Sequence, residues 1–130
     1  MAELTADEAQ GLSSFLGSIT EYTELESLAL ISREGLRLAF SAVPGYNIDP
    51  DLFSSLSAVV VQSASDAIET LGFTNMLEVV LRGVNGFIIL SAAGKFFLMG
   101  ASREMPDLGK VVKVFRYYAG EIAKRYPKNQ

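Results

Sequence analysis

Paired carboxylates are the first residues in this sequence that could do chemistry, as general acids and bases. Two pairs are present, Asp49 with Asp51 and Glu24 with Glu26. Asp49 precedes Pro50, which is typical of a helix N-cap followed by proline at the first helical position, and Asp51 adds negative charge to the first turn. Glu24 and Glu26 fall in a loop or at an exposed strand edge. We therefore interpret both pairs as structural and predict no catalytic residue.

A glycine-bracketed segment and one arginine are the candidates for phosphate chemistry. The segment Gly83-Val84-Asn85-Gly86 does not match the GxxxxGK[ST] phosphate loop, and it joins two predicted strands instead of entering a helix. We interpret it as a hairpin turn. Arg103 lies in the loop before the last predicted helix, where an arginine finger could project. A solvated loop arginine is commoner, so we keep Arg103 only as a candidate contact for a partner protein.

The composition excludes several classes of site. The chain of 130 residues contains no cysteine and no histidine. Disulfides, thiolate or imidazole metal ligands, cysteine nucleophiles and histidine-based triads are therefore excluded, and we predict no metal site, no cofactor and no enzymatic activity. The formal net charge of −4 argues against nonspecific nucleic-acid binding, which needs a basic surface.

The size and hydropathy indicate one ordinary globular domain over residues 1–130. The chain is 49% hydrophobic and 20% charged. Its first residues lack the basic segment and apolar core of a signal peptide, and its longest apolar runs are too short to span a bilayer. We predict a cytoplasmic protein with no stable membrane insertion.

Charge is distributed unevenly along the chain. Residues 1–30 contain six acids and no lysine or arginine, whereas residues 110–128 contain one acid, Glu121, and six bases. These bases are Lys110, Lys113, Arg116, Lys124, Arg125 and Lys128. We interpret the basic segment as a solvated helix face, and a docking surface for an acidic partner or a membrane is the alternative.

Hydrophobic periodicity predicts the element order α-β-β-α-β-β-β-α. A capping box from Thr5 to Glu8 opens the first helix, and the last helix spans residues 107–126. Strands are predicted at residues 25–32, 36–40, 76–82, 87–92 and 95–100. The later strands are apolar on both faces, so the sheet must be covered by helices on both sides.

The middle helix, residues 49–71, is the best-marked element. Its apolar residues recur at helical spacing: Leu52, Leu56, Val59, Val60, Ala64, Ala67, Ile68 and Leu71. Its neighbouring faces carry mostly small residues: Ser54, Ser57, Ala58, Val61 and Ser65. We expect the apolar stripe to pack on the sheet, and the small residues to let the backbone of a second copy approach closely.

The third predicted strand supports the same dimer. Leu77, Val79 and Leu81 alternate with other residues along it, and its backbone groups would be unpaired if it were a sheet edge. Pairing with the same strand of a second copy would satisfy them. The predicted homodimer interface therefore contains Ser54, Ser57, Ala58, Val61, Ser65, Leu77, Val79 and Leu81.

The element order, the chain length, the hairpin Ser32-Arg33-Glu34-Gly35-Leu36 and the Pro44-Gly45 break resemble the Roadblock/dynein light chain family. The resemblance covers nearly the whole chain. It implies an α+β fold with a five-stranded antiparallel sheet in the order 2-1-5-4-3, the middle helix on one face and the other two helices on the opposite face. It also implies a homodimer in which middle helices pack antiparallel and third strands pair.

In function, the resemblance implies a non-catalytic regulator or scaffold of a small Ras-like GTPase. The alternative is a small-molecule sensor of the PAS/GAF-like type, which shares this class of fold. A sensor needs a roomy pocket with a few convergent polar groups. The predicted strands are densely apolar, which favours the regulator.

Overall fold

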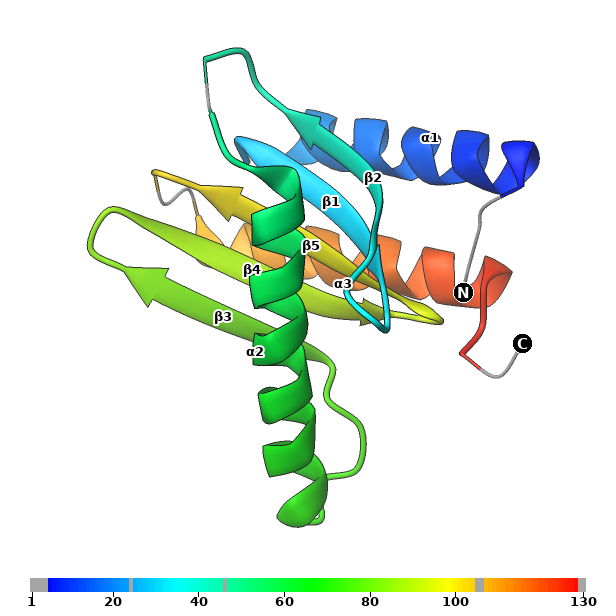
Figure 1. The fold of residues 1–130 in the computed structure, drawn as a ribbon, viewed down its shortest axis with the longest axis vertical. Coiled ribbons are helices and arrows are strands. Elements are labelled where there is room, and N and C mark those ends of the chain that lie inside the picture. Colours follow the sequence, from blue (N-terminus) through cyan, green and yellow to red (C-terminus); the bar gives the residue numbers. More distant parts are fainter. Residues whose placement is uncertain (1–4, 24, 46, 105–106, 129–130) are drawn as a thin grey trace.

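The computed structural model describes residues 5–23, 25–45, 47–104 and 107–128. Its elements follow the predicted order: α1 (Ala6–Tyr22), β1 (Ser27–Ser32), β2 (Arg37–Ala42), α2 (Pro50–Thr70), β3 (Glu78–Gly83), β4 (Gly86–Ala93), β5 (Phe96–Ser102) and α3 (Leu108–Arg125). The strands form one antiparallel sheet in the order β2-β1-β5-β4-β3, which confirms the predicted topology. In Figure 1, α2 crosses one face of the sheet, and α1 and α3 lie on the other.

The helices begin where the sequence predicts caps. The Thr5 hydroxyl accepts a hydrogen bond from the Glu8 backbone N–H at 3.1 Å, and the Thr5 N–H donates to the Glu8 carboxylate at 3.0 Å. The Asp49 carboxylate accepts from the N–H groups of Asp51 and Leu52, at 3.0 and 3.2 Å. These bonds satisfy backbone donors that have no partner within the helix, so the capping predictions are confirmed.

Two apolar clusters hold the layers together, one on each face of the sheet. Alternate residues of β5 point to opposite faces: Phe96 and Leu98 join the cluster under α1 and α3, whereas Phe97 and Met99 join the cluster under α2. The first cluster also contains Phe115 of α3, which is fully buried. A sheet covered on both sides explains why the sequence of β5 has no polar alternation.

The face that α2 presents to the sheet differs only in part from the predicted one, because Val60, Ala64 and Ile68 pack against the sheet-side cluster as predicted. Phe53, Ser54, Ser57 and Val61 are its buried residues, with exposed fractions of 1–5%. The predicted sheet-facing residues Leu52, Leu56, Val59 and Leu71 are instead exposed, by 55–66%. Their predicted packing on the sheet is wrong. The helix is apolar on more than one face, so periodicity alone could not choose its rotation.

The small residues of α2 allow the turn between β1 and β2 of the same chain to approach closely. The turn between β1 and β2 passes over α2 at Gly35, where φ is +90°. A Cβ atom at Gly35 would lie 2.7 Å from the Cβ atom of Ala58. The glycine therefore serves both the left-handed turn and the contact with the helix.

Candidate interaction site

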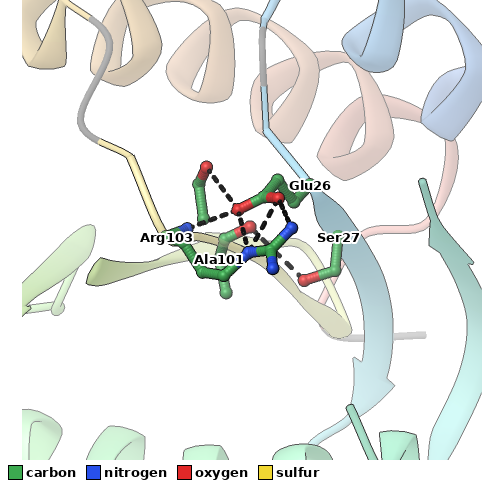
Figure 2. Close-up of polar contacts among 5 residues, drawn as sticks. Glu26, Ser27, Ala101 and Arg103 are labelled. Carbon is green, nitrogen blue, oxygen red and sulfur yellow. Dashed lines mark hydrogen bonds and ion pairs between the residues drawn. The ribbon is translucent and has the colours of Figure 1, made fainter. Parts of the chain in front are cut away.

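Arg103 is held by a carboxylate that lies far from it in the sequence. β1 and β5 are neighbouring antiparallel strands, and their register places Ser27 opposite Ala101. Glu26 precedes β1 and Arg103 follows β5, so the two residues meet just beyond the paired segment (Figure 2). The Arg103 backbone N–H donates to Glu26 Oε1 at 2.6 Å, and Arg103 Nε donates to Glu26 Oε2 at 3.0 Å. Arg103 Nη2 also pairs with Oε2.

These contacts favour the ionised form of the Glu26 carboxyl. Hydrogen bonds from the Arg103 side chain, and then from its backbone, lower the pKa of Glu26 from 4.5 to about 2. The Ser102 hydroxyl adds a third donor, at 3.3 Å from Oε1. Arg103 is thus fixed by several charge-assisted bonds, whereas a mobile finger would need to leave them. Glu24, the other member of this carboxylate pair, lies outside the described residues.

An apolar hollow of about 510 Å³ opens beside Arg103, between the start of α2 and strands β3 to β5. Arg82 and Arg103 are its charged lining residues, and we refer to it as the arginine hollow. Its other lining residues are Ile48, Phe53, Leu81, Gly83, Asn85, Gly86, Phe87, Ile88, Ala101 and Ser102. The Arg103 guanidinium is engaged by Glu26, and Arg82 borders the hollow at the end of β3.

The glycine-bracketed segment forms one wall of the arginine hollow. Gly83 and Gly86 face each other in the ladder of β3 and β4, so the predicted hairpin turn is confirmed. A Cβ atom at Gly86 would lie 2.7 Å from the Ser102 carbonyl oxygen. The glycine therefore lets the hairpin approach the end of β5.

A second exposed apolar surface combines the outer side of α2 with two leucines at β3. Leu52, Leu56 and Val59 lie on one helical face and are 55%, 58% and 65% exposed. Leu77, just before β3, is 68% exposed, and Leu81 of β3 is 40% exposed. We refer to these five residues as the leucine face. Large exposed apolar groups gathered on one side of a protein are typical of an interaction surface.

The structure separates the eight residues predicted for the dimer interface. Leu77 and Leu81 are exposed, and Val79 packs partly under α2. Ser54, Ser57 and Val61 are buried in their own chain, so they have no surface to offer a second copy, and we correct this part of the prediction. Ala58 and Ser65 are half-buried and line a hollow of about 390 Å³ beside the β1–β2 turn.

Acidic side chains are the candidate metal ligands among the described residues, because the chain has no histidine or cysteine. No three acidic, histidine or cysteine side chains of this part of the chain are grouped to hold a metal ion. Asp49 caps α2, and Asp51 pairs with Arg37 at 3.0 Å, which agrees with a structural role for both. None of the helices that the structure describes is long and apolar enough to cross a bilayer.

Sequence reasoning missed three features of this region. The bond between Glu26 and Arg103 joins residues 77 positions apart, and no local sequence pattern predicts it. Arg82 is visible in the sequence only as part of a predicted strand. The exposure of Leu52, Leu56 and Val59 depends on the rotation of α2, although their spacing on one helical face is visible in the sequence.

Known structures resemble this chain over nearly its whole length. The gliding protein MglB from Thermus thermophilus is 20% identical, with 97% of this chain and 95% of that chain covered and a TM-score of 0.84. MglB of Myxococcus xanthus is 16% identical, with coverages of 96% and 94% and the same TM-score. An MglB described in a tetrameric arrangement is 21% identical, with coverages of 97% and 94% and a TM-score of 0.84. At these identities the likeness establishes the fold.

The sequence itself carries the family assignment. No match was found among curated protein sequences. The family model of the Roadblock/LC7 domain, however, matches residues 13–102, which run from α1 to the end of β5. This match covers more than half of the chain and agrees with the observed strand order. The chain therefore belongs to the Roadblock/LC7 domain family.

Proposed function

We propose that this protein is a non-catalytic homodimeric regulator or scaffold that binds a small Ras-like GTPase in the cytoplasm. The observation that carries the proposal is the leucine face on α2 and beside β3. The family membership supports it, because the resemblance implies dimeric regulators of this kind. Two neighbouring surfaces enter the proposal, one for a second copy of the chain and one for the GTPase, and Leu81 belongs to both.

The leucine face is the proposed contact between the two copies. Leu52, Leu56 and Val59 follow one another at spacings of four and three residues, so they form a continuous stripe along α2. Two such stripes related by a two-fold axis would pack antiparallel, because a symmetric dimer contact uses the same patch on both partners. A stable interface of ordinary size takes about 800 Å² from each partner.

The edge strand β3 is the second part of the proposed dimer contact. β3 is the last strand of the sheet, and along its outer edge it has no neighbouring strand among the described residues. Unpaired backbone groups of an edge strand can bond to another strand. Pairing of β3 with β3 of the second copy would join the two sheets and bring Leu77 and Leu81 into the contact.

The arginine hollow is the proposed contact for the GTPase. It combines an apolar lining with Arg82 at its border, and a guanidinium group that forms no ion pair with a described residue suits a protein surface that presents carboxylates. Because Arg103 is held by Glu26, we propose that it positions the partner and does not enter the active site of the GTPase. The sensor alternative has less support, because apolar side chains fill both faces of the sheet.

The test is a pull-down with the purified protein from a native lysate, in the presence of GDP or a non-hydrolysable GTP analogue. We expect mass spectrometry to identify a small Ras-like GTPase that is enriched with one of the two nucleotides. Titration of the purified pair should then give about tenfold weaker binding for Arg82→Ala. Lys124→Ala, on the opposite side of the sheet, is the matched control and should bind like the wild type.

Two results would contradict the proposal. One is the absence of any enriched GTPase with either nucleotide. The other is a GTPase that binds the wild type, Arg82→Ala and Leu56→Glu equally well, since these changes alter the two proposed surfaces.

A further inference from the structure

A group of tyrosines on the α1 and α3 side of the sheet has no role in the proposed dimer or in GTPase binding. Tyr22 at the end of α1 and Lys113, Val114, Tyr117 and Tyr118 of α3 line a surface hollow of about 430 Å³. We refer to it as the tyrosine hollow. It lies across the sheet from α2, so a dimer formed through the leucine face would leave it accessible on both copies (Figure 1).

Two of the three rings of the tyrosine hollow pack against neighbouring rings. Tyr118 packs edge-on against Phe15, with ring centroids 6.3 Å apart, and Tyr117 packs edge-on against Tyr118 at 5.0 Å. Tyr22 and Tyr117 are nevertheless 56% and 62% exposed. Rigid aromatic rings lose little conformational entropy when a partner covers them, which is why tyrosine is frequent at binding hot spots.

Two lysines of α3 lie at or next to the tyrosine hollow, and the acidic residue beside it in the sequence is Glu21, which precedes Tyr22. Lys113 lines the hollow and Lys110 lies one helical turn before it. Neither lysine forms an ion pair with another described residue. By contrast, Arg116 pairs with Glu78, and Lys124 pairs with Glu121 at 3.0 Å. The two unpaired ammonium groups make this surface complementary to acidic side chains.

We propose that the tyrosine hollow is a docking site for an acidic peptide segment of a partner protein. An aromatic or large aliphatic side chain of the peptide inserts between Tyr22 and Tyr117, and its flanking carboxylates lie near Lys110 and Lys113. This surface is separate from both surfaces of the proposed function. A dimer could therefore carry this partner and a GTPase at the same time.

The geometry favours a peptide over a lipid membrane. Membrane-binding helices insert protruding apolar side chains and carry several basic residues, each worth about 1 kcal/mol near an anionic surface. Here the hollow is shallow, and two basic residues near it, Arg116 and Lys124, are engaged by carboxylates of the same chain. Two ammonium groups contribute little binding to an anionic bilayer, whereas they can each pair with one carboxylate of a peptide.

The test uses fluorescent ten-residue peptides with the sequence Glu-Asp-Glu-Asp-Xaa-Xaa-Asp-Glu-Asp-Glu, measured by fluorescence anisotropy with the full chain. Xaa-Xaa is Phe-Phe, Leu-Leu or Ser-Ser, and a fourth peptide replaces every acid of the Phe-Phe peptide by lysine. We expect the Phe-Phe or the Leu-Leu peptide to bind at least about tenfold more tightly than the Ser-Ser and lysine peptides. Failure of both apolar acidic peptides to do so would overturn the proposal.

Four variants locate the binding on the protein. Tyr117→Ala and Lys113→Glu should each weaken binding by about tenfold, whereas Tyr117→Phe and Lys113→Arg should keep it within about twofold. Leu36→Ala, an exposed apolar residue of the β1–β2 turn, is the control and should bind like the wild type. Equal binding by Tyr117→Ala and the wild type would show that the peptide binds elsewhere, and would overturn the proposal.

Two further measurements address other occupants of the same surface. One is sedimentation with vesicles of phosphatidylcholine and phosphatidylserine, and the other is the mass in solution by light scattering. We expect no vesicle binding that depends on Lys113, and no change of mass in Tyr117→Ala. Binding of vesicles that is lost in Lys113→Glu, or a lower mass of Tyr117→Ala, would overturn the proposal in favour of a membrane or a second copy.

Discussion

The carboxylate of Glu26 accepts hydrogen bonds from both the backbone and the side chain of Arg103, and so joins the residue before β1 to the residue after β5. The pair extends the contact between these strands beyond their backbone ladder. It also fixes a basic side chain at the rim of the arginine hollow. Fold stability and the proposed partner contact thus share one ion pair.

The Glu26–Arg103 pair predicts a specific dependence of stability on pH. Because the pKa of Glu26 is lowered from 4.5 to about 2, its ionised form stabilises the fold above pH 4.5, and this contribution is lost as the pH falls towards 2. Glu26→Gln should therefore lower the free energy of unfolding at neutral pH and flatten its pH dependence in that window. Urea unfolding at a series of pH values measures both effects.

Glu69→Gln is the matched control for this experiment. Glu69 is an exposed carboxylate of α2 that forms no ion pair with a described residue. We expect the free energy of unfolding of Glu69→Gln to depend on pH as that of the wild type does. If the free energy of unfolding of Glu26→Gln also changed with pH as that of the wild type does between pH 4.5 and 2, the pKa of Glu26 could not be lowered as described.

The contact between Gly35 and Ala58 predicts a coupling between the β1–β2 turn and α2. Gly35→Ala adds a Cβ atom 2.7 Å from that of Ala58, in a left-handed backbone conformation, and should cost about 1–3 kcal/mol of unfolding free energy. Gly45→Ala has a similar φ of +85° and nothing within 4 Å, so it measures the backbone cost alone.

A double-mutant cycle isolates the steric part of this cost. Ala58→Gly removes the opposing Cβ atom and should itself cost about 1 kcal/mol, because glycine disfavours helix. Combined with Gly35→Ala, it should relieve the clash, so that the two changes couple by at least about 0.5 kcal/mol. Chemical denaturation measures the unfolding free energies. If the change in the double variant equalled the sum of the changes in the two single variants, the turn and the helix would not touch.

The leucine face predicts how the proposed dimer is broken. Leu56→Glu and Val59→Glu place like charges on both copies near the two-fold axis, and each should lower the mass in solution from dimer to monomer. Light scattering at micromolar concentration measures this, with Gln10→Glu on α1 as a control of equal added charge. A wild-type protein that is already monomeric at this concentration would contradict the dimer.

Once a GTPase partner has been identified, Arg103→Ala distinguishes an arginine that positions the partner from an arginine finger that enters its active site. A finger supplied in trans contributes about 10³- to 10⁵-fold in rate. Because Glu26 holds Arg103, we expect stimulation of GTP hydrolysis to fall by less than about tenfold, or about 1.4 kcal/mol in barrier height. A complete loss of stimulation, with dimerisation and binding intact, would assign Arg103 to the chemistry.

Two aromatic residues of α3 should differ sharply in their effect on stability. Phe115 is fully buried against the sheet, so Phe115→Ala should cost about 3–5 kcal/mol through lost burial and a cavity. Tyr117 lies two residues away and is 62% exposed, and Tyr117→Ala should change stability by no more than about 0.5 kcal/mol. Thermal and chemical unfolding of both variants would check this, and similar losses would contradict the orientation of α3.

The sequence by itself determined the element order, the helix caps and the hairpin turns of this protein. The capping box at Thr5, the Asp49 cap and the Gly35 turn each depend on residues only a few positions apart. The apolar runs of β4 and β5 also predicted a sheet covered on both sides, which is a property of the local pattern. The family resemblance supplied the strand order.

Only the tertiary structure decided which residues face a partner. α2 is apolar on several faces, and in its observed rotation Phe53 is buried against the sheet and Ala58 lies under Gly35. Ser54, Ser57 and Val61 consequently lie inside the chain, and Leu52, Leu56 and Val59 lie outside. Glu26 and Arg103 meet because the register of β1 and β5 aligns their ends. Contacts of this kind depend on packing between elements distant in sequence, which no local pattern encodes.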